Sequence, residues 1–355
     1  MTDSSLLLSG LTTLRLGGPA RDVVRCADTT SLIATLAALD DAGTPVLIVG
    51  GGSNLVIGDD GFPGTAVVIE SSGYTFAADE DGKPYVSADA GLEWDTLVAA
   101  TIDNGFGGLE CLSGIPGSTG ATPVQNVGAY GVEIADILRS VDVYDRATRT
   151  AGTLTPDDLE LGYRSSILKY RADKVVVAVS FWLTPDRRSR PLRYRELFTA
   201  LGVDAGQDAD AADVRTAVLS LRGGKGMVLN PDDHDTWSAG SFFTNPIVDA
   251  ARAPEILDRI RTRLGKDVTI PQYPAPDGAV KLSAGWLIER AGFAKGHPGE
   301  HAPARLSTKH TLALTNRGPA TTEDLLTLAR EVRSGVRDAF GVDLHPEPVL
   351  VGCEI

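Results

Sequence analysis

Residues 45–54, PVLIVGGGSN, place a short apolar run directly before three consecutive glycines. An apolar run of this length, bounded by turn residues, is typical of a buried β-strand. The glycines let backbone N–H groups approach an anion without interference from Cβ atoms, and Ser53 and Asn54 add side-chain donors. Taken alone, the turn fits an ordinary strand-to-loop connection as well as a phosphate site. It lacks the GK[ST] of a P-loop and the GxGxxG dinucleotide fingerprint.

A second glycine-rich segment, residues 111–132, contains no charged residue. Gly, Ser, Thr, Pro, Gln and Asn dominate it, so it is not a membrane span. Two such segments in one chain favour a single long ligand with a diphosphate and polar ring edges, which is the shape of a dinucleotide. The alternative is an irregular glycine-rich core loop.

The remaining sequence predicts a mixed helix and strand architecture. Ser31 is the expected N-cap of the first helix, and Thr321 with Asp324 fits a capping box before the last helix, which Gly341 ends. Residues 162–170 read as strand-like. Helices are predicted over residues 31–43, 93–105 and 321–341, and strands over residues 45–49 and 64–70. Residues 140–150 show period-two alternation followed by a polar turn, and residues 342–352 read as a turn followed by a final strand.

Length, charge and cysteine content limit the class of protein. The 355 residues correspond to roughly two to three domains. The formal net charge of −14 argues against a nucleic-acid or anionic-membrane partner. Three widely spaced cysteines, Cys26, Cys111 and Cys353, exclude a disulfide scaffold or a CxxC metal site. The N-terminus lacks the basic region of a signal peptide, so a cytoplasmic location is expected.

Several catalytic motifs are absent or weak. No GxSxG nucleophile elbow occurs. His297 and His301 have the i, i+4 spacing of a zinc-binding helix, but Pro298 and Gly299 between them argue against a helix, so no metal is expected. Cys111 lies in an apolar context and is expected to be a buried structural thiol.

Three polar residues stand out locally. Arg164 lies in GYRSSILKY (162–170), Ser241 in SAGSFFTNP (238–246) and Glu347 in HPEPV (345–349). Each has an ordinary alternative: a surface salt bridge for Arg164, a cap for Ser241 and a solvated turn for Glu347. Separately, the pattern favours these ordinary roles.

Together, however, seven segments in order along nearly the whole chain resemble the UDP-N-acetylenolpyruvoylglucosamine reductase family. They are TTLRLGGPA (12–20), LIVGGGSNLVIGDDGFPG (47–64), GLECLSGIPGSTGATPVQNVGAYG (108–131), GYRSSILK (162–169), AGSFFTNP (239–246), KLSAGWLIERAGF (281–293) and HPEPVLVG (345–352).

The resemblance implies an α+β fold of the vanillyl-alcohol-oxidase/PCMH type, in which two subdomains bind FAD and a C-terminal α+β domain binds substrate. The first subdomain would comprise residues 1–72, rejoined by residues 336–355. The second would comprise residues 73–225, including an excursion at residues 190–222 that carries the tyrosine loop of one subgroup. The substrate-binding domain would comprise residues 226–335. We expect a monomer.

The resemblance assigns both glycine-rich segments to noncovalent FAD, with NADPH as the hydride donor. The implied FAD-binding residues are Gly50, Gly51, Gly52, Ser53, Asn54, Leu55, Ser113, Ile115, Pro116, Gly117, Ser118, Thr119, Gly120, Gln125, Asn126, Gly128, Ala129 and Tyr130.

The resemblance also implies a mechanism. NADPH reduces FAD, and hydride then passes from flavin N5 to C3 of the enolpyruvyl group of UDP-N-acetylglucosamine enolpyruvate, which develops negative charge at C2. Arg164 and Glu347 would stabilise that charge, which requires a protonated Glu347 with a raised pKa, and Ser241 would protonate C2.

Three further residues are implied in substrate binding: Lys225 at the diphosphate, Asn245 in the SFFTNP motif, and Tyr194 over the UDP end. The spacing from Lys225 to Ser241 is longer than the family pattern. Two other functions remain open at this point. One is an FAD-dependent sugar or alcohol oxidase of the same fold, and the other is a noncatalytic flavin- or nucleotide-binding regulator.

Overall fold

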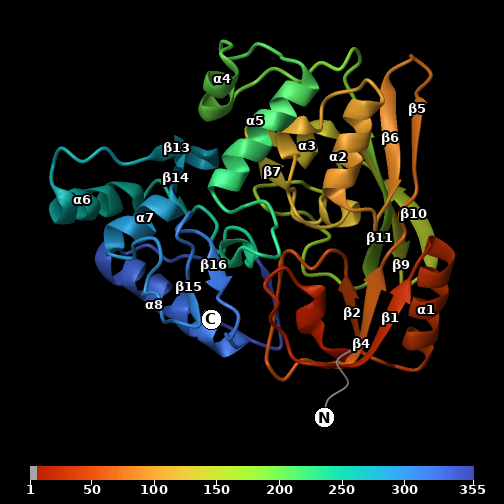
Figure 1. Ribbon diagram of the computed structural model, residues 1–355, viewed down its shortest axis with the longest axis horizontal. Coiled ribbons are helices and arrows are strands. Elements are labelled where there is room, and N and C mark those ends of the chain that lie inside the picture. Colours follow the sequence, from red (N-terminus) through yellow and green to blue (C-terminus); the bar gives the residue numbers. More distant parts are fainter. Residues whose placement is uncertain (1–5) are drawn as a thin grey trace. The chain divides into compact units, whose positions relative to one another are not determined.

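The apolar run before the three glycines forms β2 (Val46–Val49), an edge strand of a parallel three-stranded sheet. Its order is β1-β4-β2, with β1 (Ala20–Cys26) and β4 (Phe62–Ile69). Helix α1 (Thr29–Asp41) connects β1 to β2 and lies beside β1 (Figure 1). The computed structural model describes residues 6–355.

The start of α1 differs from the sequence prediction. Its N-cap is Asp28, whose side chain accepts a hydrogen bond from the Ser31 N–H at 2.7 Å. Ser31 instead occupies the N3 position and completes a capping box. Both residues are good cap formers, so the local sequence pattern does not distinguish them.

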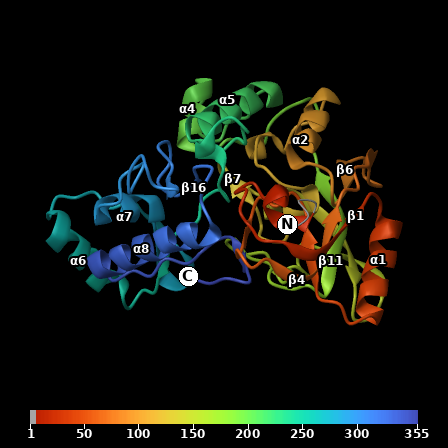
Figure 2. The same cartoon turned by 60° about the horizontal axis from the view of Figure 1, so that its bottom comes forward.

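A five-stranded antiparallel sheet follows, in the order β10-β9-β11-β6-β5. Its central strand β11 is mostly buried and rich in valine, as expected of a strand covered on both faces. Helices α4 and α5 pack against each other (Figure 2). The bounds are β5 (Tyr74–Ala78), β6 (Pro84–Asp89), α2 (Trp94–Asp103), β7 (Gly128–Ala129), β8 (Val132–Glu133), α3 (Ile134–Ile137), β9 (Leu138–Asp145), β10 (Thr150–Leu154), β11 (Lys174–Trp182), α4 (Arg195–Leu201) and α5 (Ala211–Gly224).

The C-terminal part builds a second hydrophobic core around helix α8 (Thr322–Phe340). As predicted, Thr321 and Asp324 form a capping box, and Gly341 ends the helix at φ +73°. Helix α8 packs against α6, α7, β15 and β16. The bounds are β3 (Leu55–Ile57), β12 (Ile247–Val248), α6 (Ala253–Leu264), β13 (Gln272–Pro274), β14 (Val280–Leu282), α7 (Ala284–Ala291), β15 (Ala304–Leu306), β16 (Leu314–Asn316) and β17 (Val349–Val351).

The chain divides into two compact units. The first contains Pro19–Gly52 and Phe62–Val228, and the second contains Leu8–Gly18, Ser53–Gly61 and Leu229–Ile355. The expected division joined residues 336–355 to residues 1–72. Strand β17 pairs in parallel with β3, and Leu14, Leu16 and Val56 are buried in the second core. The borders of the three expected domains stay a prediction.

Residues 162–170 form turns and isolated bridges, so the strand-like interpretation of this segment was wrong. No helix within residues 6–355 is long and apolar enough to cross a membrane.

Candidate active site

The two glycine-rich segments meet inside the first unit. A Cβ atom on Gly50 would lie 2.3 Å from the Ser118 Oγ, and one on Gly51 would lie 2.5 Å from the Gly117 Cα. At Gly51 no other residue type fits without moving the opposite backbone, whereas at Gly50 the Ser118 hydroxyl would have to rotate away. The three-glycine turn therefore lies directly against the second segment, as a shared ligand requires.

The donors of this cradle are open for a ligand. Within the described residues, the backbone N–H groups of Gly50, Gly51 and Gly52 donate to no protein acceptor, and neither do those of Gly117 and Ser118. Clustered backbone N–H groups of this kind bind phosphate oxygens. The arrangement fits the diphosphate of a dinucleotide such as FAD.

The second segment also holds an unsatisfied buried hydroxyl. Thr119 is fully buried, and its Oγ1 has no hydrogen-bond partner within the described residues. The Thr119 N–H itself donates to the Leu92 carbonyl oxygen at 2.7 Å, and the Gly120 N–H to that of Ala90 at 2.8 Å. The backbone of Thr119 is thus fixed, while its hydroxyl oxygen has no hydrogen-bond partner in residues 6–355. A polar ligand atom would supply that partner.

Asn126 braces the end of this segment. Its Nδ2 donates to Glu133 Oε2 at 2.9 Å and to the Gly162 carbonyl oxygen at 3.0 Å, and its Oδ1 accepts from the Ala135 N–H at 2.9 Å. The residue adopts φ +45°, an unusual conformation that asparagine tolerates better than most residues. The Asn126 side chain is therefore engaged in holding the loop.

Arg164 lies against the same segment. Its Nη2 donates to the Gly128 carbonyl oxygen at 2.7 Å and its Nη1 to that of Asn126 at 3.3 Å. The Lys169 ammonium donates to the Arg164 carbonyl oxygen at 3.0 Å. Arg164 also adopts φ +54°, a conformation that costs free energy and is often found at functional sites. The fold thus holds this guanidinium beside the predicted FAD segment.

A group of aromatic and charged residues adjoins the end of α5. The Tyr130 and Tyr194 rings meet edge to face with centroids 5.2 Å apart. Lys225 forms an ion pair with Glu196 at 2.7 Å. Burial alone would lower the pKa of Lys225, but the hydrogen bond to Glu196 and nearby charges outweigh it and raise the pKa. Tyr130, Tyr194 and Lys225, which were all predicted to bind ligand, thus belong to the first unit. Their neighbour Glu196 was not predicted from the sequence.

Ser241 and Glu347 lie on paired segments of the second unit. The Glu347 N–H donates to the Phe242 carbonyl oxygen at 2.9 Å, and the Thr244 N–H to that of His345 at 3.0 Å. Asn54 joins this arrangement, because its Nδ2 lies 3.5 Å from the Glu347 carbonyl oxygen. The fold therefore brings together two of the three predicted catalytic residues, although they are more than 100 residues apart in the sequence.

Other predicted residues have structural contacts of their own. The Asn245 Oδ1 accepts from the Ala284 N–H at 2.9 Å, at the start of α7. Ser53, Asn54 and Leu55 belong to the second unit, unlike the other residues assigned to FAD. Cys111 is buried, and burial strongly raises the pKa of its thiol, as befits an unreactive structural cysteine.

Sequence reasoning missed a pair of residues that hold the second segment in place. Asp95 accepts from the Gly114 N–H at 2.6 Å and from both Nη atoms of Arg215, at 2.6 and 2.8 Å. Near them, burial lowers the pKa of the Arg222 guanidinium to about 10, and its Nε has no partner within the described residues. The spacing of 120 residues between Asp95 and Arg215 gives no local signal for this contact.

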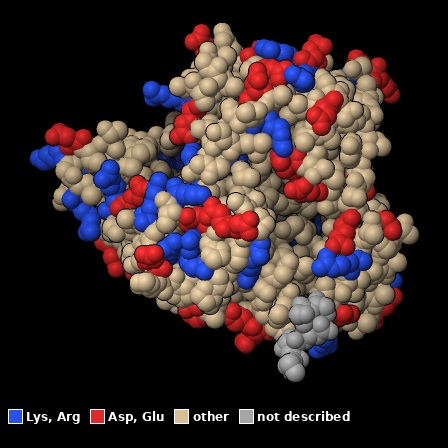
Figure 3. Space-filling view, viewed as in Figure 1, with Lys and Arg blue, Asp and Glu red and all other residues tan. Residues whose placement is uncertain are grey.

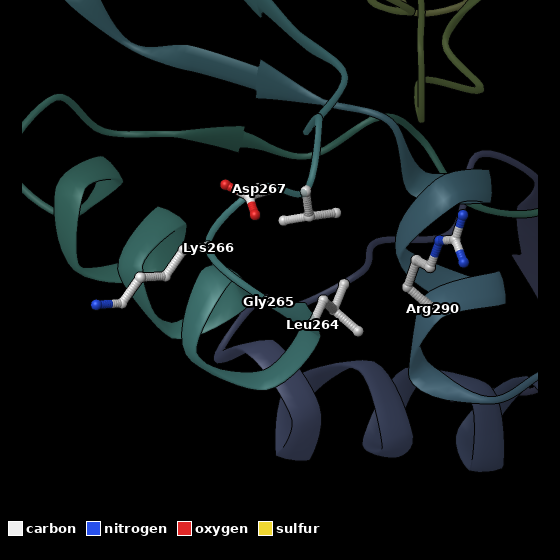
Figure 4. A pocket seen from close by; sticks show the side chains of 6 residues that line it. Leu264, Gly265, Lys266, Asp267 and Arg290 are labelled. Atoms are coloured by element: carbon white, nitrogen blue, oxygen red, sulfur yellow. The ribbon is translucent and has the colours of Figure 1, made fainter.

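A surface hollow of about 400 Å³ lies elsewhere, in the second unit (Figure 4). It lies between the end of α6 and Arg290 of α7 and contains none of the predicted site residues. No group of three or more metal-ligating side chains occurs in residues 6–355.

Comparison with known proteins gives matches over both parts of the chain. Residues 20–151 match the FAD binding domain family model, and residues 231–351 match the model for the C-terminal domain of UDP-N-acetylenolpyruvoylglucosamine reductase. The reductase of this name from Nocardia farcinica is 60% identical over 98% of this chain and 89% of its own length. The one from Saccharopolyspora erythraea is 58% identical over 98% of this chain and 95% of its own length.

A solved structure agrees with these matches. The crystal structure of UDP-N-acetylenolpyruvylglucosamine reductase from Thermus caldophilus has a TM-score of 0.62 with this chain. The two sequences are 25% identical, and the comparison covers 97% of each chain.

Proposed function

Because the chain belongs to the UDP-N-acetylenolpyruvoylglucosamine reductase family, we propose that Arg164, Ser241 and Glu347 are its catalytic residues. The enzyme reduces the enolpyruvyl group of UDP-N-acetylglucosamine enolpyruvate to give UDP-N-acetylmuramate for peptidoglycan synthesis, with FAD as cofactor and NADPH as reductant. The expected FAD-binding fold with a C-terminal domain is confirmed, and the oxidase and regulator alternatives are set aside.

The observation that carries the proposal is the close approach of the two glycine-rich segments. Gly51 faces Gly117 at a distance that excludes any side chain, and the surrounding backbone N–H groups have no protein acceptor within the described residues. These residues would hold the FAD diphosphate, and the Thr119 hydroxyl would bond a polar atom of the cofactor. When bound, FAD would supply the hydride for C3 of the enolpyruvyl group, with NADPH as its source.

Arg164 supplies fixed positive charge. Two backbone carbonyl oxygens hold its guanidinium, so little reorganisation is needed as negative charge develops at C2 and on the substrate carboxylate. Glu347 in its protonated form donates a hydrogen bond to the same developing charge. A protonated carboxyl is required there, because a carboxylate would repel the charge.

Ser241 donates the proton that completes the reduction. The substrate gains hydride at C3 and a proton at C2, and the Ser241 hydroxyl recovers its proton from water. A serine hydroxyl is a weak acid, so its position relative to C2 matters more than its acidity. Gly240, at φ +72°, provides the turn that presents Ser241.

Lys225, Tyr194 and Asn245 bind the UDP part of the substrate. Lys225 already pairs with Glu196, so a diphosphate must share or replace that partner. Tyr194 is 38% exposed, which leaves part of its ring available for stacking. The raised pKa of Lys225 keeps its ammonium charged at neutral pH, as diphosphate binding needs.

We further propose a monomeric enzyme of the cytoplasm, where NADPH and nucleotide sugars are present, with no nucleic-acid or membrane partner. The net charge of −14 supports this, since nucleic acids and anionic membranes attract basic surfaces. On the face shown in Figure 3, basic and acidic side chains are interspersed.

Stopped-flow absorbance of the flavin separates the two half-reactions and tests the assignment. In Ser241→Ala, we expect NADPH to reduce the flavin at the normal rate and the enolpyruvyl substrate to reoxidise it at least ~100-fold more slowly. Ser334→Ala, in α8, is the matched control and should behave as the unsubstituted enzyme. Normal reoxidation in Ser241→Ala would remove Ser241 as the proton donor.

A further inference from the structure

The segment TTLR, residues 12–15, has no role in the chemistry proposed above, yet it forms a tight turn in the second unit. The Arg15 N–H donates to the Thr12 carbonyl oxygen at 3.1 Å, and the Thr12 Oγ1 donates to that of Leu16 at 3.0 Å. Leu14 and Leu16 anchor the turn in the second core. Arg15 adopts φ +55°, which an arginine keeps only where its surroundings hold it.

The turn contacts the loop that carries Ser241. Thr13 Oγ1 donates to the Ser238 carbonyl oxygen at 2.7 Å. The Arg15 guanidinium stacks over the Trp237 ring, 4.1 Å from its centroid. These two contacts hold adjacent residues of the loop from a segment more than 220 residues away in the sequence.

Strand β16 holds the same two segments. The Asn316 N–H donates to the Trp237 carbonyl oxygen at 3.0 Å, and the Asn316 Nδ2 donates to the Leu14 carbonyl oxygen, also at 3.0 Å. One asparagine thus joins the turn and the loop. On the other side of Ser241, the Phe242 N–H donates to the Leu312 carbonyl oxygen at 2.8 Å.

Ser241 therefore lies in a short stretch between two residues that are held in place, Ser238 and Phe242. The Gly240 N–H donates to the Ser238 Oγ at 3.2 Å, so the Ser238 backbone and side chain set the course of the next residues. A shift of Ser238 therefore moves the Ser241 hydroxyl. Proton transfer is sensitive to such shifts, since a misplacement of about 1 Å can cost roughly 100-fold in rate.

We infer that Thr13 and Arg15 are positioning residues that fix the Ser241 hydroxyl for protonation of the substrate. The inference rests on the proposed function of Ser241 and adds that a turn near the N-terminus sets its place. Neither residue takes part in the chemistry itself; both act through Ser238 and Trp237.

The test compares two buried threonines of the same turn. Thr13 is 8% exposed and Thr12 is 7% exposed, but only Thr13 bonds to the Ser241 loop. In Thr13→Val, we expect normal FAD content, normal reduction by NADPH, and reoxidation by the enolpyruvyl substrate roughly tenfold slower. The solvent deuterium isotope effect on reoxidation should increase, because protonation becomes more rate-limiting.

Thr13→Ser, which keeps the hydroxyl, should restore the reoxidation rate to within about twofold. Arg15→Lys keeps the charge but loses the planar stacking, and should also slow reoxidation. Thr12→Val is the control: it removes a hydroxyl of similar burial whose hydrogen bonds, to the Leu16 carbonyl oxygen and N–H, do not reach the Ser241 loop. It should leave both half-reactions within about twofold, whatever it does to the melting temperature.

Two results would overturn the inference: equal slowing in Thr13→Val and Thr12→Val, or unchanged reoxidation in Thr13→Val. Ser241→Ala distinguishes this failure from failure of the proposed function. If Ser241→Ala stalls reoxidation while the two threonine variants behave alike, only the positioning role is wrong. If Ser241→Ala reoxidises normally, the proton-donor role itself is wrong.

Discussion

Replacing Gly51 with alanine should weaken FAD binding, because the new Cβ would collide with backbone. It would lie 2.5 Å from the Gly117 Cα, 2.8 Å from the Gly117 carbonyl carbon and 3.0 Å from the Ser118 nitrogen. Ordinary contacts begin near 3.4 Å. The two segments must therefore separate by about 1 Å, and both are backbone, so no flexible side chain can turn away.

The size of the effect follows from the cost of overpacking. Extra methyl groups in closely packed sites typically cost about 1–3 kcal/mol. In the Gly51→Ala apoprotein we expect the two segments to separate, whereas FAD binding requires them close together, so this cost should appear in the affinity for FAD. At about 1.4 kcal/mol per factor of ten, the Kd for FAD should rise roughly 5- to 150-fold.

The assay is titration of the apoprotein with FAD, followed by the change in flavin fluorescence. Gly152→Ala is the matched control, because a Cβ on Gly152 in β10 has no atom within 4 Å. Its Kd should stay within about twofold of that of the unsubstituted protein. A Gly51→Ala protein that is folded and binds FAD with an unchanged Kd would refute the assignment of this cradle to FAD.

Substitutions at three other positions should change the stability of the protein. Burial alone would raise the pKa of Asp95, but hydrogen bonds from Arg215 and from a backbone N–H outweigh it and lower the pKa below 3.8. The pair therefore stabilises the fold at neutral pH, and this stabilisation is lost as the pH falls through the lowered value. Urea unfolding should show Asp95→Asn about 1–3 kcal/mol less stable at pH 7, with the difference shrinking at pH 3; a constant difference would contradict the ion pair. Thr321→Ala removes the capping box of α8 and should cost about 1 kcal/mol in thermal unfolding, whereas an unchanged melting temperature would argue against the cap. Gly224→Ala, in the last turn of α5 with open space around the Cβ, should stabilise the protein by about 0.5–1 kcal/mol, and destabilisation would show that the glycine is needed there.

Local patterns predicted individual elements well where a single principle determines the outcome. The capping box and terminal glycine of α8 both appear as expected, because each depends only on neighbours within a few turns. The N-cap of α1 was misplaced by three residues, since Asp28 and Ser31 are equally suited to the position. Residues 162–170 were misread because their spacing suits a strand, while contacts with distant carbonyl oxygens hold Arg164 in a turn.

In the candidate site, too, only local features could be predicted. The ordered motifs identified the site residues, but they did not predict which other residues those side chains contact. The pairing of Lys225 with Glu196 and the use of the Asn126 side chain as a loop brace depend on segments brought together by folding. These contacts decide which groups are already engaged in the protein before a ligand binds.

By itself, the sequence determined the family, the cofactor class and the positions of the glycines that bring backbone N–H groups near an anion. Such features are local, because glycine acts through its own φ and its missing Cβ. Only the tertiary structure decided that Gly51 faces Gly117 and that Thr13 reaches the Ser241 loop. The reason is physical: contacts between residues tens to hundreds of positions apart depend on which segments pack together in the two hydrophobic cores. No local spacing in the sequence encodes that packing.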